Sequence, residues 1–291
     1  MKFLIADAFT ETTFGGNPAG IVILPENTDF PSDEICVKTA AELRYSETAF
    51  IKILGNNEFR IRYFTPAAEV DLCGHATIAS FYALKYLGII EENCTCINHT
   101  LAGDLNIEIK DGFVMMDMAS PEEISVMEDP AAVKELYSIM GASCNPETIA
   151  LKPRMISTGL PDIMMPVPDL KALNELTPDM QALAELSKRY QVVGVHAFTL
   201  ECEEGVTAHA RNFAPLYDID EEAATGTSSG AMTYYFYLND LISAKDHCRY
   251  IQGEAMDRPS VILTEINAEN NHCLIKVGGS AVILAEGEIH I

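Results

Sequence analysis

The stretch Asp71-Leu72-Cys73-Gly74-His75-Ala76-Thr77 decides the fold, because a related stretch, Ala224-Thr225-Gly226-Thr227-Ser228-Ser229-Gly230, returns about half a chain later. Each stretch opens an apolar run typical of a helix, at residues 78–87 and 231–241. A glycine turn at a helix N-terminus presents bare backbone N–H groups at the positive end of the helix dipole, which favours bound anions. We therefore expect the two turns to face one another and hold an anion.

Three further pairs of segments match in the same order. Arg62-Tyr63-Phe64-Thr65-Pro66 resembles the segment 149 residues later, and Glu47-Thr48-Ala49-Phe50-Ile51 resembles the segment 148 residues later. Gly16-Asn17-Pro18 resembles Gly159-Leu160-Pro161 at a spacing of 143, and the two turn glycines are 152 apart. A repeat of this length predicts two homologous domains related by a pseudo-twofold axis, with a cleft between them.

Composition sets limits on the partners. The chain has 291 residues, 48% of them hydrophobic, which is enough for about two domains with their own cores. Its net charge of −24 comes from 43 acidic and 19 basic side chains, which argues against nucleic acid or an anionic membrane as partner. We expect a small anionic ligand to be held mainly by backbone amides and hydroxyls.

The termini and the cysteines indicate the compartment. Asp7 interrupts the N-terminal apolar run before a signal core could form, and no uncharged run approaches membrane-spanning length. The eight cysteines lack C-x-x-C spacing. We therefore expect a cytoplasmic protein with reduced thiols.

Short β-rich runs bounded by turn residues alternate with one long helix in each half. The predicted strands of the first half are residues 3–8, 19–24, 48–54, 59–64, 106–110 and 113–118. Those of the second half are residues 155–157, 162–167, 192–199, 208–213, 261–265 and 273–277, and a final strand covers 281–291. Peripheral helices are predicted at residues 33–43, 130–139 and 180–190. The pattern favours a curved, mainly antiparallel sheet around a central helix in each half.

Several motifs together resemble the phenazine biosynthesis PhzF isomerase family. They are Asp7-Ala8-Phe9-Thr10, Gly16-Asn17-Pro18-Ala19-Gly20, Ser46-Glu47-Thr48-Ala49-Phe50, Arg62-Tyr63-Phe64-Thr65-Pro66, Leu72-Cys73-Gly74-His75-Ala76-Thr77 and Ala224-Thr225-Gly226-Thr227. The resemblance implies the α+β fold of diaminopimelate epimerase, with two pseudo-symmetric domains that each wrap a β-barrel around a central helix. It also implies that the last strand returns to the first domain. We therefore expect one domain at residues 1–119 plus 280–291, a second at 120–279, and an active site in the cleft between them.

The two turns differ at the position before the glycine. Cofactor-independent racemases of the same superfamily carry a cysteine there in each half, and the two thiols exchange protons. This chain has Cys73 in the first turn but Thr225 in the second. Because a threonine hydroxyl is far too weak a base to replace a thiolate, two-thiol racemization is disfavoured. We interpret Cys73 as a small buried residue, with Cys73 and Thr225 kept as secondary candidates.

Glu47 is the better candidate for proton transfer. Its counterpart in the second half is Val195, so the carboxylate breaks the internal symmetry. The family resemblance implies that Glu47 removes a proton from one carbon and returns it to another, whereas the alternative is a surface glutamate at a strand start. His75 follows Gly74 at a helix N-terminus, which disfavours a charged ring. The matching family position lines the site, although His75 could equally bond only to backbone.

The substrate carboxylate should bind to Gly74, Gly226 and Thr227 through N–H groups and the Thr227 hydroxyl. The same residue types would also suit an ordinary helix cap. The family commonly has Glu-Asp-Pro before the second turn and serine after its glycine, whereas this chain has Glu221-Glu222-Ala223 and Thr227. Glu222 is one methylene longer than aspartate and would reach the substrate differently, which puts the family's best-known substrate in doubt.

Other groups of residues are weaker candidates. Cys94-x-Cys96-x-x-His99 lacks a fourth metal ligand and is interpreted as part of a turn-rich connection. Cys73 and His75 should point in different directions from a helix start. His196 takes the place of Thr48 in the repeat and could face the cleft or solvent, and Asn17 could border the site.

The sequence thus predicts an isomerase that needs no cofactor or metal and moves a proton within a small carboxylated metabolite. Glu47 is the acid/base, His75 its polar partner, and a homodimer is compatible with the resemblance. Two alternatives stay open: an epimerase that uses Cys73, and a binding protein of the same fold without catalytic activity.

Overall fold

The computed structural model of the chain describes residues 1–269 and 272–291. The chain folds into two compact units, Met1–Asp117 with Gly278–Ile291, and Met118–Val277. Each unit combines a large mixed sheet with a few helices, so the fold is α+β. The wrapping of each sheet into a barrel stays a prediction.

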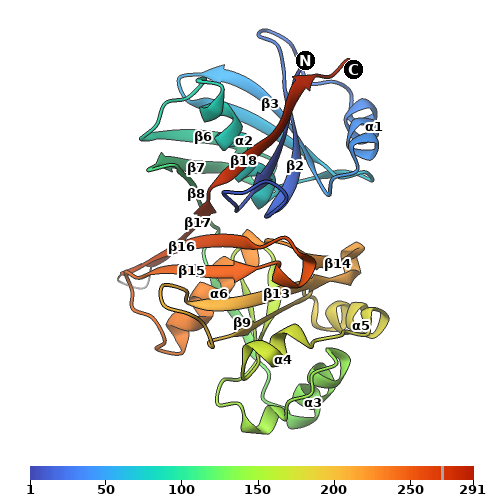
Figure 1. Cartoon of the computed structure of the whole chain (residues 1–291), viewed down its shortest axis with the longest axis vertical. Coiled ribbons are helices and arrows are strands. Elements are labelled where there is room, and N and C mark those ends of the chain that lie inside the picture. Colours follow the sequence, from blue (N-terminus) through green and yellow to red (C-terminus); the bar gives the residue numbers. More distant parts are fainter. Residues whose placement is uncertain (270–271) are drawn as a thin grey trace. The chain divides into compact units, whose positions relative to one another are not determined.

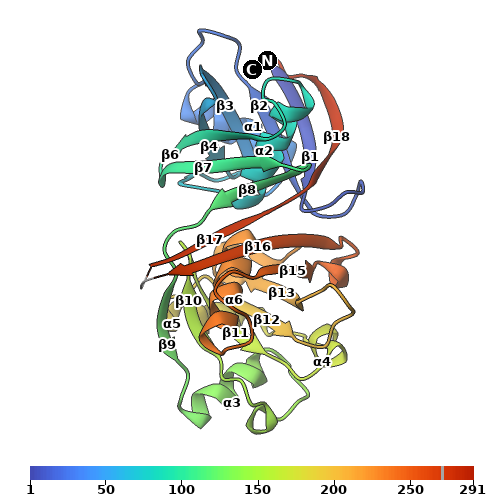
Figure 2. The ribbon, with the colours of Figure 1, turned by 90° about the vertical axis from the view of Figure 1, so that its left-hand side faces the viewer.

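The first unit contains two helices and nine strands among the described residues. The helices are α1 (Asp33–Leu43) and α2 (Gly74–Tyr86). The strands are β1 (Lys2–Ala8), β2 (Asn17–Ile23), β3 (Thr48–Gly55), β4 (Glu58–Phe64), β5 (Glu69–Val70), β6 (Cys94–Thr100), β7 (Gly103–Lys110), β8 (Phe113–Asp117) and β18 (Ala281–Glu288). β18 returns from the end of the chain to pair with β1, as Figures 1 and 2 show.

The second unit holds the middle of the chain. Its helices are α3 (Pro130–Ile139), α4 (Leu170–Asn174), α5 (Met180–Tyr190) and α6 (Gly226–Leu238), with 3-10 turns η1 (Pro146–Thr148), η2 (Pro215–Tyr217) and η3 (Glu254–Met256). Its strands are β9 (Glu122–Val126), β10 (Arg154–Ser157), β11 (Pro161–Pro166), β12 (Val195–Thr199), β13 (Ala208–Ala214), β14 (Ile219–Glu222), β15 (His247–Gln252), β16 (Ser260–Glu269) and β17 (His272–Gly279). The last two residues of β17 belong to the first unit.

The two units pair their strands in the same way. In the first unit β1–β2, β3–β4, β4–β5 and β6–β7 are antiparallel, whereas β2–β3 and β4–β6 are parallel. In the second unit β10–β11, β12–β13, β13–β14 and β15–β16 are antiparallel, whereas β11–β12 and β13–β15 are parallel. The order and direction of these pairings are therefore the same in both halves.

The register corrects one part of the predicted repeat. Phe50 stands opposite Arg62, whereas Ala197 stands opposite Arg211, so β3 corresponds to β12 at a spacing of 147 rather than 148. The bonds from Gly20 N to Glu47 O and from Ile163 N to Gly194 O agree with this spacing. A slip of one residue moves every side chain of a strand to the other face. The counterpart of Glu47 is therefore Gly194, not Val195.

Each unit has one helix that is apolar all round, as buried helices are. α2 packs against β1, β2, β3, β8 and β18. Tyr63 and Thr77 share a hydrogen bond of 2.6 Å between their hydroxyls, and Asn98 Nδ2 donates to the Tyr63 hydroxyl at 2.9 Å, which fixes α2 on the sheet. α6 packs in the same way against β10, β11 and β16.

Most predicted elements are present, but one interpretation was wrong. Residues 94–100 form strand β6 rather than a turn-rich connection. Side chains alternate along a strand, so His99 points away from Cys94 and Cys96, whose sulfurs are 3.8 Å apart. The Nδ1 atom of His99 faces Asp104 Oδ1 at 2.7 Å instead, and these three residues cannot share a metal.

Within residues 1–269 and 272–291, no helix is long and apolar enough to cross a membrane. All eight cysteines are free thiols.

Candidate active site

Glu47 lies in the short connection immediately before β3, in the first unit. Its backbone carbonyl accepts a hydrogen bond from Gly20 N at 3.3 Å, which joins the connection to β2. Its side chain is 14% exposed and its Oε2 atom lies 3.2 Å from Nε2 of His75. Among the described residues, no donor is aligned to form a hydrogen bond with this oxygen. A nearly buried carboxylate oxygen is thus held in place yet can still accept a proton.

His75 is in the first turn of α2 and connects the polar groups of the site. Asn17 Nδ2 lies 3.3 Å from Nδ1 of the ring, and Ser46 Oγ lies 3.4 Å from Nε2. Because an amide nitrogen can only donate, Nδ1 accepts and the ring hydrogen belongs on Nε2, which lies 3.2 Å from Glu47 Oε2 without being aligned for a hydrogen bond to it. Burial lowers the pKa of His75 despite the opposing charge of Glu47. Burial therefore favours the neutral ring.

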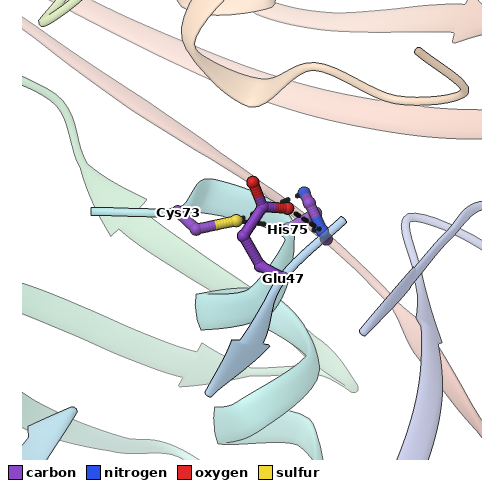
Figure 3. A group of neighbouring side chains, drawn as sticks. All are labelled: Glu47, Cys73 and His75. Carbon is purple, nitrogen blue, oxygen red and sulfur yellow. Dashed lines mark hydrogen bonds and ion pairs between the residues drawn. The ribbon is translucent and has the colours of Figure 1, made fainter. Parts of the chain in front are cut away.

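Cys73 and His75 are in contact, contrary to the prediction from their spacing. The sulfur lies 3.4 Å from Nδ1 and 3.8 Å from Nε2. Figure 3 shows the two side chains beside one another. The prediction assumed helical geometry at both positions. Cys73 is the N-cap residue with an extended backbone, φ −136° and ψ 116°, so its side chain turns back over the first turn of α2.

Glu47, Cys73 and His75 therefore form one cluster, in which the oxygen, sulfur and nitrogen atoms all lie within 4.8 Å of one another. The sequence analysis named all three residues and paired His75 with Glu47, but it predicted that Cys73 would point away from His75. The packing of α2 on β2 and β3 and the extended N-cap bring them together. Asn17, at the start of β2, belongs to the same group, as expected for a residue bordering the site.

The turn in the second unit has the same backbone shape but different polar contacts. Thr225 is the N-cap of α6, with φ −130° and ψ 100°. Its hydroxyl donates to Glu222 Oε2 at 2.7 Å, and Gln252 Oε1 accepts from its backbone N–H at 3.2 Å. Thr225 thus holds the Glu222 carboxylate where Cys73 contacts an imidazole in the first unit.

Both helix N-termini lack a side-chain cap. Neither Cys73 nor Thr225 makes a capping hydrogen bond, so neither side chain occupies the first-turn N–H groups. In α6 the backbone of Thr227 is fixed by Thr158, whose hydroxyl donates to the Thr227 carbonyl at 2.8 Å. Gly226 is buried and Thr227 is half-buried. The arrangement suits an anion held by backbone N–H groups.

A buried polar group near the start of α6 was missed by the sequence analysis. Ser228 in α6 donates to Asp162 Oδ2 from β11, and His196 Nδ1 donates to Asn212 Oδ1 at 3.0 Å. Burial raises the pKa of Asp162 to about 6, against the opposing hydrogen bonds from Ser228 and Gly194. Burial also lowers the pKa of His196 to about 4, although the bond to Asn212 opposes this.

The position of His196 requires a further correction. The ring is completely buried, so it does not face solvent, and the register makes Ala49 its counterpart rather than Thr48. At the matching positions of the first unit, Asp162 and Ser228 correspond to Ala19 and Ala76. The buried pair Asp162 and Ser228 therefore has no polar counterpart in the first unit.

An α+β fold with a carboxylate, a thiol and an imidazole grouped at a helix N-terminus is consistent with isomerases and epimerases. A model of phenazine biosynthesis-like proteins matches residues 6–287. An uncharacterized isomerase of Clostridium acetobutylicum is 30% identical over 297 residues, covering 97% of this chain and 96% of that protein. An uncharacterized isomerase of Bacillus subtilis is 32% identical, covering 95% and 94%.

Solved structures of similar fold point to the same family as the sequence matches. A PhzF family protein of Bacillus anthracis superposes with a TM-score of 0.85 at 27% identity, and each chain is covered completely. A probable proline racemase of Agrobacterium radiobacter shares the fold, with a TM-score of 0.66 at 12% identity over 100% of this chain and 93% of that one. The chain belongs to the phenazine biosynthesis-like PhzF family, and it is an enzyme of the isomerase type.

Proposed function

We propose that the protein is a cofactor-independent isomerase that moves a proton within a small carboxylated metabolite, with Glu47 as the acid/base. The observation that carries this proposal is the environment of Glu47 Oε2. The atom is buried, it lies 3.2 Å from His75 Nε2, and no donor among the described residues is aligned to form a hydrogen bond with it. A general base must have a free lone pair within reach of the proton that it removes. Glu47 would take a proton from one carbon and return it to another, so the carboxylate is regenerated.

His75 would position Glu47 and stabilise charge on the substrate. Since the ring is neutral and its hydrogen is on Nε2, it can donate to the carboxylate or to an oxygen of the substrate without losing a proton. A neutral donor also leaves Glu47 as the group that changes protonation state. Asn17 and Ser46 hold the ring in this orientation.

Gly74, Gly226 and Thr227 stay the proposed ligands of the substrate carboxylate. The uncapped first turns of α2 and α6 support this role. Glu222 would contact a polar group of the same substrate, oriented by Thr225. A homodimer and a cytoplasmic location also stay predictions, and sedimentation of the purified protein tests the first.

One observation favours a second candidate function, an epimerase that uses Cys73. Its sulfur lies 3.4 Å from His75 Nδ1, so the imidazole could take the thiol proton. The second unit weakens this candidate, because Thr225 has no thiol and its hydroxyl is engaged with Glu222. The two candidates differ in which residue activity requires.

Proton NMR in D₂O tests the proposal by following deuterium entry into a panel of small cyclic and amino carboxylates. We expect Glu47→Gln to lower the exchange rate by about 10²- to 10⁴-fold, the usual contribution of a general acid/base. Glu42→Gln, an exposed glutamate of α1, is the matched control and should leave the rate unchanged. Loss of exchange in Cys73→Ser but not in Glu47→Gln would overturn the proposal in favour of the epimerase.

Thr227 provides a separate test of carboxylate binding. Thr227→Val removes the hydroxyl but keeps the shape, and we expect KM to rise about 10-fold with a smaller change in kcat, since one hydrogen bond to a charged group is worth about 1.5–3 kcal/mol. Thr227→Ser restores the hydroxyl and should restore KM. If both variants behave like the wild type in steady-state kinetics, Thr227 does not bind the carboxylate.

A further inference from the structure

The cluster at the start of α2 combines three kinds of metal-binding donor. Cys73 offers a sulfur, His75 a ring nitrogen and Glu47 a carboxylate oxygen, all within 4.8 Å of one another. The three groups come from two segments, the connection before β3 and the first turn of α2. The site is enclosed but not sealed, because Cys73 is 8% exposed and the Glu47 side chain 14%.

The distances suit a small tetrahedral ion. Zinc bonds of about 2.0–2.1 Å to nitrogen, 2.0–2.2 Å to oxygen and 2.3 Å to sulfur imply ligand separations of about 3.3 Å for nitrogen to oxygen and 3.6 Å for nitrogen to sulfur. The observed separations from His75 Nε2 are 3.2 Å to Glu47 Oε2 and 3.8 Å to Cys73 Sγ. Small side-chain rotations would therefore complete the geometry.

The neighbouring residues can supply the required tautomer. A metal on Nε2 needs the ring hydrogen on Nδ1, and metal-bound histidines usually donate this hydrogen to a neighbouring oxygen. Asn17 lies 3.3 Å from Nδ1, and a rotation of its amide would present Oδ1 as the acceptor. Three protein ligands leave a fourth position for water, as in many zinc sites that are not purely structural.

We propose that Glu47, Cys73 and His75 form a binding site for Zn²⁺, and that the bound ion reversibly inhibits the enzyme. The thiol releases its proton to solvent when the metal binds, and no electron is transferred. The sulfur and nitrogen donors select zinc over magnesium or calcium, which prefer oxygen ligands. The proposal that zinc inhibits the enzyme rests on the proposed function, because a carboxylate bound to zinc cannot accept a proton from the substrate.

Metal binding is measured first, without reference to activity. Co²⁺ replaces zinc as a probe, and a cysteine thiolate ligand gives it a near-ultraviolet charge-transfer band. We expect one Co²⁺ per chain with this band, displaced by Zn²⁺ and unaffected by Mg²⁺. Cys73→Ser should abolish the band, and competition with a chromophoric chelator should show Zn²⁺ affinity lowered by more than about 100-fold, since even outer partners contribute 10- to 100-fold.

Matched variants distinguish metal binding at this site from metal binding by Cys94 and Cys96. Cys94 and Cys96 are 3.8 Å apart, and Cys94→Ser/Cys96→Ser should leave the stoichiometry and the band unchanged. Asn17→Leu should lower zinc affinity about 10-fold without loss of the thiolate band, as expected for an outer partner. A band that survives Cys73→Ser, or that disappears in the Cys94/Cys96 variant, overturns the site.

Inhibition is measured second, on the wild-type protein with a substrate found by the NMR panel. We expect activity to fall in proportion to Zn²⁺ occupancy and to return fully on addition of EDTA. Full activity at saturating zinc would overturn the inhibitory role, whereas the Co²⁺ spectrum would still report the site. If Glu47→Gln proves to be fully active, the proposed function fails, and the spectra test the metal site independently.

Discussion

At the scale of single residues, Asp162 is the least expected feature of the second unit. It is 1% exposed, and its Oδ2 atom accepts a hydrogen bond from the Ser228 hydroxyl. Its folded-state pKa is raised from 3.8 to about 6, so the folded protein holds the proton more tightly than the unfolded chain does. Stability from this group therefore increases as the pH falls from 6 to 3.8, and ionisation above pH 6 is destabilising.

Asp162→Asn should consequently stabilise the protein at pH 8 by about 3 kcal/mol, since one pKa unit corresponds to about 1.4 kcal/mol. The gain should shrink as the pH falls below 6, where the wild-type carboxyl becomes protonated. His196 acts in the opposite direction, because its lowered pKa makes protonation between pH 6.5 and 4 destabilising, but it is present in both proteins. Urea unfolding at several pH values measures the difference, with the exposed Asp220→Asn as control. A loss of stability at pH 8 would contradict the prediction.

His209 is a second residue whose charge matters for stability. Its Nδ1 lies 2.7 Å from Glu254 Oε2 and its Nε2 lies 3.0 Å from Glu203 Oε2. Burial lowers its pKa, but the hydrogen bonds and charges of the two glutamates outweigh burial, and the folded-state pKa is raised above 6.5. A raised pKa stabilises the fold below pH 6.5, and this contribution is lost as the pH rises through the folded-state value.

We expect Glu203→Gln/Glu254→Gln to reverse the direction of the His209 pKa shift, because only burial then remains. The titration of the His209 ring protons by NMR measures this, and Glu204→Gln, an exposed neighbour, is the control. The same double variant should lose stability at pH 6 and change little at pH 9. An unchanged titration curve would show that the glutamates do not set the pKa.

At the scale of strands and helices, Gly194 explains why Glu47, the proposed acid/base, has no counterpart in the second unit. A Cβ atom there would lie 1.8 Å from the Phe213 carbonyl oxygen and 2.8 Å from its carbonyl carbon. These are backbone atoms that can move only if β12 and β13 separate. The position that holds Glu47 in one unit therefore cannot hold any side chain in the other.

Gly194→Ala should lower the free energy of unfolding by about 3 kcal/mol, the upper end of the usual range for overpacking. Gly20→Ala is the comparison, because its Cβ would meet only side-chain atoms, Thr48 Oγ1 at 3.0 Å and Leu43 Cδ1 at 3.2 Å, which can shift. We expect a clearly smaller loss there. Thermal unfolding of both variants checks the difference, and equal losses would contradict the backbone argument.

The elements also show how far the sequence alone could lead. The helices at residues 33–43, 130–139 and 180–190 were predicted with their observed bounds, because capping residues and apolar periodicity are local signals. The alignment of β3 with β12 was predicted at a spacing of 148 instead of 147, because similar residues in neighbouring positions match almost equally well. Contact between Cys73 and His75 depends on the backbone angles of a single N-cap residue, which no spacing rule reveals. The pairing of Asp162 with Ser228 joins residues 66 apart and leaves no periodic trace.

At the scale of the whole molecule, the first unit is discontinuous in sequence, yet the termini that complete it are neighbours. β18 pairs with β1 from Lys2 opposite Glu288 to Ala8 opposite Ala281. The N-terminal amino group donates to the Ile289 carbonyl at 2.7 Å, and Figures 1 and 2 both draw the two ends together. Residues 1–117 alone would leave β1, with its buried Leu4 and Ala6, without this partner.

A permuted chain of residues 278–291, a six-residue Gly/Ser linker and residues 1–117 should therefore fold on its own, whereas residues 1–117 without β18 should not. A flexible linker of that length spans about 13 Å on average, which exceeds what the neighbouring termini require. Because Glu47, Cys73 and His75 all lie in this unit, the permuted chain should give the same Co²⁺ thiolate band as the full protein. It should not isomerise substrate, because Gly226 and Thr227, which are proposed to bind the substrate carboxylate, belong to the other unit. Folding is measured by circular dichroism, metal binding by the Co²⁺ spectrum, and activity by the D₂O exchange assay. A permuted chain that folds and catalyses exchange at the full rate would show that the second unit does not bind the substrate.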